Sequence, residues 1–74
     1  MSIGDRVRTR RQELRLSQEE VARRAGVSMG IVHRLERGTI TDPHFSTLSG
    51  IAHALDTTVG ELAGEEEPAV PLAM

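Results

Sequence analysis

Signals that start and stop helices recur at short intervals along this 74-residue chain. Three segments open on a serine, whose hydroxyl can accept a bond from the free N–H groups of a helix's first turn. At Ser17 the sequence continues Gln-Glu-Glu, which places Glu20 where it completes a capping box. Gly26 follows this second segment, and glycine ends a helix at low cost because it adopts left-handed backbone freely. These signals predict three helices, which run from Ser2 to about Leu14, from Ser17 to Gly26 and from Ser28 to Gly38.

Two more helices are predicted in the second half. Asp42 ahead of Pro43 suits a helix start, with aspartate at the cap and proline in the first turn. Thr58, with Glu61 three residues later, opens a short fifth helix by a second capping box. The residues expected on buried faces are Ile3, Val7, Leu14, Val21, Ala22, Ala25, Val32, Leu35, Phe45, Leu48, Ile51, Ala52, Leu55, Val59 and Leu62. Since no stretch alternates with a period of two, the predicted fold class is all-α.

The chain is long enough for one domain, which we expect to span residues 1–63. From Gly64 the sequence GEEEPAVPLAM combines a charge run with two prolines, which predicts a disordered tail over 64–74. Its AVPLAM end is either solvated or a docking segment for a partner. No apolar run approaches the roughly 18–20 residues of a membrane span, and the N-terminus is too charged for a signal peptide. We therefore expect a cytoplasmic protein without a membrane partner.

The charges are distributed unevenly along the chain. Residues 1–37 hold all nine arginines and five carboxylates, a net charge of +4, whereas residues 38–74 hold six carboxylates and no arginine or lysine, a net charge of −6. Phosphate contacts respond to the local field rather than to the overall charge of −2. The pattern fits nucleic-acid binding by the first half, and it also fits solvated helix faces followed by an acidic tail.

The central segment, residues 17–37, pairs two short predicted helices across a turn of two residues. Gly26 and the small side chains of Ala22 and Ala25 allow two helices to cross steeply, which would project the second as a ridge that fits the major groove of B-DNA. The strings RLSQEEVARRAGVSMGIVHRLERGTITDP and TLSGIAHAL closely resemble the Cro/CI repressor-type, or xenobiotic-response-element, helix-turn-helix family. This resemblance covers about residues 3–63 and implies a lambda-repressor-like five-helix bundle, dimeric on DNA, with helix 3 (about 28–37) in the major groove.

The resemblance assigns roles to individual residues. Arg34 is the strongest candidate for reading a base, because its fork matches a guanine edge, although a phosphate clamp or a solvated arginine is the plainer alternative. Ser17 and Gln18 would meet phosphate, or serve only in capping. Arg11 and Glu36 match a salt bridge between the first and third helices, or are two unrelated surface charges. The implied base contacts are Ser28, Met29, Gly30, His33 and Arg34, and the implied phosphate contacts are Arg11, Ser17, Gln18, Arg37, Thr39 and His44.

Several positions depart from the family pattern. Met29 and Gly30 stand where hydrogen-bonding side chains are common, so direct readout of bases looks sparse and DNA shape would carry more of the specificity. Arg10 replaces an apolar residue, and Arg15 stands where the family often has glycine. His44 replaces a capping serine, so that either its imidazole meets phosphate or Asp42 takes over the cap.

Nothing in the sequence indicates an enzyme or a cofactor. The chain has no cysteine, and no two of its three histidines have the i, i+4 spacing of a helical metal site.

The main hypothesis is a sequence-specific transcriptional regulator, a repressor that binds an inverted-repeat operator in double-stranded DNA as a homodimer. Phage-type repressors, restriction-modification controllers and autoregulating antitoxins all fit this class. The alternative is a protein-interaction module, such as an antitoxin or bridging factor, with weak or no DNA binding and a toxin or another regulator as its partner.

Overall fold

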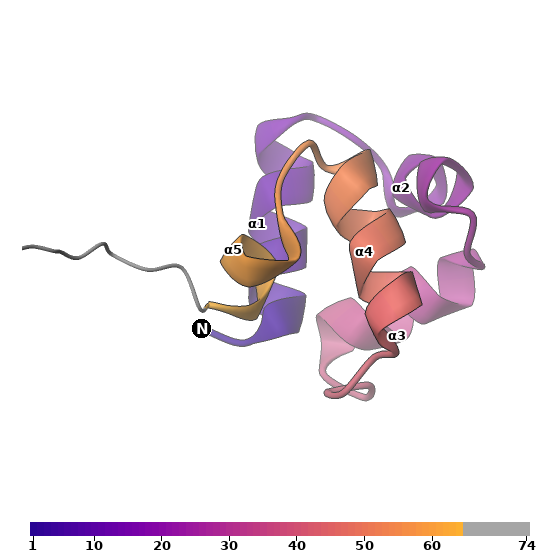
Figure 1. Cartoon of the computed structure of the whole chain (residues 1–74). Helices are drawn as coiled ribbons and strands as arrows, with labels where there is room; N and C mark the ends of the chain where they lie inside the picture. Colours follow the sequence, from indigo (N-terminus) through magenta and orange to yellow (C-terminus); the bar gives the residue numbers. More distant parts are fainter. Residues whose placement is uncertain (65–74) are drawn as a thin grey trace, which may run out of the picture.

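The computed structural model of this chain describes residues 1–64, which form five helices and no strand (Figure 1). The helices are α1 (Ile3–Glu13), α2 (Gln18–Ala25), α3 (Met29–Arg37), α4 (Phe45–Ala54) and α5 (Val59–Ala63). The predicted all-α class and five helices are confirmed. The tail predicted for residues 64–74 lies, from residue 65 on, outside the described residues.

The predicted serine and threonine caps account for four of the helix starts. The Ser2 hydroxyl accepts a bond from the Asp5 N–H at 3.1 Å, and the Asp5 carboxylate accepts one from the Ser2 N–H at 3.2 Å. Ser17 and Glu20 form the same reciprocal pair at 3.0 and 2.9 Å. The Ser28 hydroxyl accepts a single bond from the Ile31 N–H at 3.2 Å, and the Thr58 hydroxyl accepts one from the Glu61 N–H at 3.1 Å. The Glu61 carboxylate accepts from the Thr57 hydroxyl and not from the Thr58 N–H, so the capping box predicted at Thr58 is not formed.

One apolar core joins all five helices. α1 packs on α3 and α5, and α2 packs on α3 and α4, so that α4 lies across the middle of the bundle (Figure 1). The fully buried large side chains are Val7, Val21, Val32, Leu35, Ile51 and Leu55, with Ala22, Leu48, Ala52, Ala54 and Leu62 completing the core. Ile3, Ala25 and Val59 pack against it half-buried. Most of the predicted buried faces are therefore confirmed.

Two residues predicted to be buried are not. The ring of Phe45 is 72 % exposed, although its spacing from Leu48 places it on the apolar side of α4. The helical period predicts which side of a helix a side chain lies on, but not how deeply that side chain is buried. Phe45 is the first residue of α4 and lies beyond the end of the core. Leu14 caps α1 and is 37 % exposed, while Leu16 packs against the core in its place.

The predicted start of α4 is also corrected. The helix begins at Phe45 with His44 at the cap position, and no side chain bonds to its first turn. Asp42 and Pro43 both precede the helix, so proline does not lie in the first turn as expected. The residue before a proline disfavours helical backbone, but proline itself does not force a helix to begin there. The first N–H groups of α4 therefore have no side-chain partner among residues 1–64.

The backbone at Arg15 explains one departure from the family pattern. Its φ is +59°, in the left-handed region that glycine adopts most easily. The Arg15 N–H donates to the Gln12 carbonyl at 3.0 Å, and the chain then turns from α1 toward α2. Glycine would adopt this backbone conformation without the steric strain that the β-carbon of an arginine causes.

In residues 1–64, no helix has both the length and the apolar character needed to cross a membrane.

Candidate nucleic-acid interface

The turn between α2 and α3 sets the angle at which α3 leaves the bundle. Gly26 ends α2 with a φ of +74°, and its N–H donates to the carbonyls of Ala22 and Arg23. The Val27 N–H also donates to Ala22, at 3.0 Å, so the turn closes within two residues. Because Ser28 then caps α3 at once, the second helix starts in a fixed direction relative to the first.

α3 has one buried and one exposed side. Val32, Leu35 and Glu36 are buried against the other helices. The outer side of α3, as we call it, consists of the exposed residues Ser28, Met29, Gly30, His33, Arg34 and Arg37. All five residues predicted to face bases therefore lie on one exposed helix side, together with Arg37.

Arg34 is held along the axis of its own helix. Its Nε donates to the Gly30 carbonyl oxygen, one turn earlier, at 3.2 Å. A β-carbon at Gly30 would lie 3.8 Å from Nη2 of Arg34, so the glycine leaves open space beside the guanidinium. Nη1 and Nη2 make no hydrogen bond within residues 1–64 and point toward the N-terminal half of the outer side.

Glu36 anchors the opposite side of α3. Its side chain is only 2 % exposed. Nε of Arg11 donates to Oε2 of Glu36 at 2.7 Å, and Nη2 of Arg11 donates to Oε1 at 2.9 Å. Nε2 of Gln18 donates to the same Oε1 at 3.1 Å. This Glu36 cluster, consisting of Arg8, Arg11, Gln18 and Glu36, ties α1 and the start of α2 to α3.

Two residues of this arrangement were not predicted from the sequence. Nη2 of Arg8 donates to the Glu36 carbonyl oxygen at 2.7 Å, and its Nε lies 3.6 Å from the carboxylate. At Gly4, a β-carbon would lie 2.0 Å from the Leu35 carbonyl oxygen, so α1 approaches α3 by backbone contact. An isolated glycine inside a helical pattern is the only sequence signal for such an approach, and it does not name the partner.

Charge and burial oppose each other at Glu36. Burial acts to raise its pKa, but the hydrogen bonds from Arg11 and Gln18 and the charges of Arg11 and Arg8 outweigh that effect. The pKa of Glu36 is therefore lowered, and the carboxylate stays charged at neutral pH. The opposite charge of Arg11 balances it, as a buried carboxylate requires.

The residues predicted to meet phosphate fall into two groups. Ser17, Gln18 and Arg11 surround the start of α2, but Arg11 is 15 % exposed and also donates from Nη1 to the Leu16 carbonyl at 3.0 Å. Arg37, Thr39 and His44 are exposed at the end of α3 and in the segment before α4. The Ser17 oxygen accepts from Glu20, which leaves its hydroxyl proton available to donate.

Arg10 has a structural role that the sequence did not reveal. Its Nε donates to the Leu55 carbonyl at 2.9 Å and its Nη2 donates to the Asp56 carbonyl at 3.1 Å. The side chain thereby fastens α1 to the segment between α4 and α5 from a position where the family pattern has an apolar residue.

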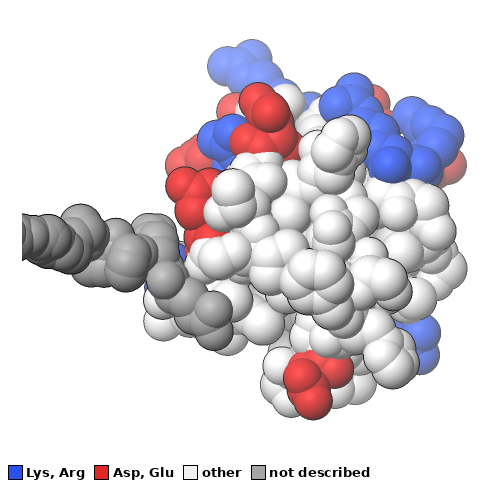
Figure 2. All heavy atoms as spheres, in the orientation of Figure 1, with Lys and Arg blue, Asp and Glu red and all other residues white. Residues whose placement is uncertain are grey.

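The distribution of charge differs between the sides of the bundle. Figure 2 shows basic side chains beside α2, acidic side chains near α1 and α5, and a broad uncharged area over α4. The sequence of α4, FSTLSGIAHA, contains no aspartate, glutamate, lysine or arginine. Within residues 1–64, no three histidine, aspartate or glutamate side chains are grouped in a way that could hold a metal ion.

The fold and this arrangement define a class of protein. A short helix, a tight turn and a second helix with one side open are the parts of a helix-turn-helix domain. Residues 7–62 match the helix-turn-helix family, and this chain belongs to that family, in its Cro/CI repressor-type branch. The fold is lambda-repressor-like, as the sequence predicted.

Relatives and solved structures support this placement. The immunity repressor of Bacillus phage phi105 is 35 % identical over 66 residues, which is 89 % of this chain and 45 % of the repressor. The P22 c2 repressor, solved in complex with a synthetic operator, superposes with a TM-score of 0.81 at 26 % identity, over 89 % of this chain and 98 % of that one. The N-terminal DNA-binding domain of SinR from Bacillus subtilis superposes with a TM-score of 0.78 at 33 % identity, over 81 % and 87 %.

The relatives are regulators and repressors rather than enzymes, which agrees with the expectation that this chain is not an enzyme. This chain spans between 30 % and 59 % of the length of three curated relatives that it matches.

Proposed function

We propose that this chain is a sequence-specific DNA-binding transcriptional regulator, a repressor that binds an inverted-repeat operator as a homodimer. The division of α3 into two sides carries this proposal. The Glu36 cluster fixes the buried side, while the outer side is exposed along the whole helix. A helix exposed in this way fits the major groove of B-DNA, which is about 12 Å wide. The P22 c2 repressor, solved with an operator, has the same fold.

Arg34 is the residue that we propose for base readout. Its Nε bond to the Gly30 carbonyl holds the guanidinium near the N-terminal half of α3, which is the part that contacts bases in this motif. The two Nη groups, which make no hydrogen bond within the described part of the chain, can then donate to O6 and N7 of one guanine. Met29 is 51 % exposed and suits apolar contact with a thymine methyl group.

Phosphate contacts would flank this helix. Gln18 already donates to Glu36 from Nε2, so its remaining donor is held at the start of α2, next to the Ser17 hydroxyl. Arg37, Thr39 and His44 are exposed beyond the other end of α3. Backbone contacts of this kind fix the register of a protein on DNA without reading its sequence. Arg11 would act mainly by orienting Glu36 and Gln18, because three of its N–H groups are already engaged.

Selection of bound fragments from random DNA tests this function. A homodimer that places two α3 helices in successive major grooves should select two inverted half-sites about one helical turn, roughly 34 Å, apart. The affinity for the selected site should fall by about 10³-fold or more between low and moderate salt if six or more phosphates are contacted. Fragments without a shared site, together with binding that salt leaves unchanged, would contradict the proposal.

A protein-interaction module is the second candidate. Phe45 is 72 % exposed at the start of α4, whose surface is uncharged, and Met29 adds a second exposed apolar side chain. Exposed apolar surface of this kind is typical of sites that bind proteins. The same selection separates the two functions, since an interaction module would enrich no operator.

A further inference from the structure

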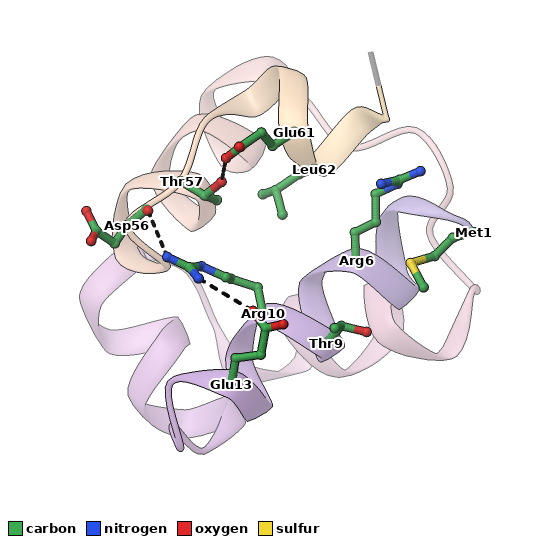
Figure 3. Close-up of a pocket in the computed structure, with 9 residues that line it drawn as sticks. All are labelled: Met1, Arg6, Thr9, Arg10, Glu13, Asp56, Thr57, Glu61 and Leu62. Carbon is green, nitrogen blue, oxygen red and sulfur yellow. Dashed lines mark hydrogen bonds and ion pairs between the residues drawn. The ribbon is translucent and has the colours of Figure 1, made fainter. Parts of the chain in front are cut away.

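A groove of about 450 Å³ lies between α1 and α5, apart from every residue proposed to contact DNA (Figure 3). α1 contributes Arg6, Thr9 and Arg10 to its walls, α5 contributes Glu61 and Leu62, and Met1 lies at one end. The groove therefore combines apolar and charged surface on a part of the bundle that the proposed function leaves unused.

The two arginines of the groove differ in their bonding. Arg10 is fully engaged, because it donates to the carbonyls of Leu55 and Asp56 and lies 3.4 Å from the Glu13 carboxylate. Nε of Arg6 is buried and has no hydrogen-bond acceptor among residues 1–64. Arg6 also forms no ion pair with those residues. Buried donors are almost always bonded, so an acceptor for Arg6 has to come from elsewhere.

The chain leaves α5 directly beside this guanidinium. A β-carbon added at Gly64 would lie 3.0 Å from Nη2 and 3.1 Å from Nε of Arg6. In Figure 3 the Arg6 side chain extends toward the end of α5. The next three residues of the sequence are Glu65, Glu66 and Glu67, the densest acidic run of the chain. Carboxylates are the preferred partners of a guanidinium.

We propose that residues 65–74 bind this groove within their own chain, with a carboxylate of the acidic run accepting hydrogen bonds from Arg6. The far end of the groove is acidic, with Glu13, Asp56 and Glu61, so the acidic run belongs at the Arg6 end. The uncharged residues that follow it can continue along the groove. Ten extended residues reach about 33 Å, while α1 from Arg6 to Glu13 rises only about 10 Å.

The Nε–H group of Arg6 offers a direct test, because its NMR signal reports both hydrogen bonding and exchange with solvent. In the full chain we expect a shifted, slowly exchanging Arg6 Nε–H signal. The substitutions E65A, E66A and E67A together remove the side-chain acceptors, and they should move this signal toward that of a free arginine and speed its exchange. They should also lower Tm by up to about 8 °C. The same three substitutions should leave Tm unchanged in a chain that also carries R6M.

Two controls distinguish a tail bound within its own chain from a general effect of charge and from a tail supplied by a second copy. Neutralising Glu19 and Asp42, which are exposed outside the groove, should leave the Arg6 signal in place, and a shift there would point to overall charge and overturn the proposal. In the second control, labelled chain with the neutralised tail is mixed with unlabelled wild-type chain. Return of the Arg6 signal to its wild-type position would show that a second copy supplies the carboxylate. An Arg6 signal that ignores the tail substitutions would mean that the groove holds no tail.

Discussion

Arg11 and Glu36 form a two-point ion pair between the last turn of α1 and the buried side of α3, with N–O distances of 2.7 and 2.9 Å. The pair is largely withdrawn from water, since the two side chains are 15 % and 2 % exposed. Its geometry fixes the rotation of α3 about its own axis, and that rotation decides which residues form the outer side. The stability of the domain and the orientation of α3, its proposed recognition helix, therefore depend on the same contact.

Removal of Arg11 should be strongly destabilising. Arg11→Met leaves the Glu36 carboxylate buried with weaker partners, and the loss of one member of a buried pair costs about 3–5 kcal/mol. We expect the lower end of that range, because Gln18 still donates to Glu36 and Arg8 lies 3.6 Å away. Urea unfolding of the variant measures the loss.

The double variant Arg11→Met, Glu36→Leu is the matched control. Because it buries neither charge, it should recover much of the stability that Arg11→Met alone loses. A double variant that is no more stable than the single one would show that the ion pair's charges are not the cause.

The pH dependence of the free energy of unfolding should show the contribution of the charged Glu36 carboxylate. Since its pKa is lowered below the ordinary value of 4.5, its carboxylate adds stability that is fully present above that value and is lost as the pH falls through the folded pKa. The difference in unfolding free energy between wild type and Glu36→Gln should therefore shrink between about pH 6 and about pH 3. Asp5, Glu20 and Glu61 also have lowered pKa values, but they are present in both proteins and cancel. A difference that stays constant with pH would contradict the assignment.

Two glycines inside helices should respond in opposite ways to alanine. At Gly30 a β-carbon meets nothing closer than 3.8 Å, so Gly30→Ala should raise the free energy of unfolding by up to about 1 kcal/mol through helix propensity alone. At Gly50 the β-carbon would lie 2.7 Å from the Ala25 carbonyl oxygen at the end of α2. Gly50→Ala should therefore cost about 1–3 kcal/mol, because α4 and α2 must separate. Thermal unfolding of both variants checks the pair, and equal signs would mean that these contacts are misplaced.

The local signals of the sequence accounted for most of this fold. Caps such as Ser17 act within four residues, and the i, i+3 and i, i+4 spacing that buries Leu48 and Ile51 is a property of a single helix. Phe45 shares that spacing and yet is exposed, because the extent of the core depends on where other helices end.

The parts of the site that the sequence missed depend on contacts between distant residues. Arg8 bonds to the Glu36 carbonyl from 28 residues away, and Gly4 meets the Leu35 backbone. Composition and helical periodicity identify neither Glu36 as the partner of Arg8 nor Leu35 as the partner of Gly4. Arg11 and Glu36 were paired in the sequence only through the family resemblance, since their spacing alone says nothing about contact.

Arg34 and Gln18 should affect DNA binding in different ways. Arg34→Ala removes the proposed guanine contact and should cost about 1–3 kcal/mol on the selected operator, with little change on unrelated DNA, so that sequence preference is lost. Gln18→Ala removes a proposed phosphate contact and should weaken all sequences alike. Titration of each variant against the operator and against a scrambled duplex, at two salt concentrations, measures both effects. Arg24→Ala, on an exposed position of α2, controls for the loss of a positive charge. If Arg34→Ala weakens the operator and the scrambled duplex equally, Arg34 contacts phosphate, and readout belongs to the other residues of the outer side.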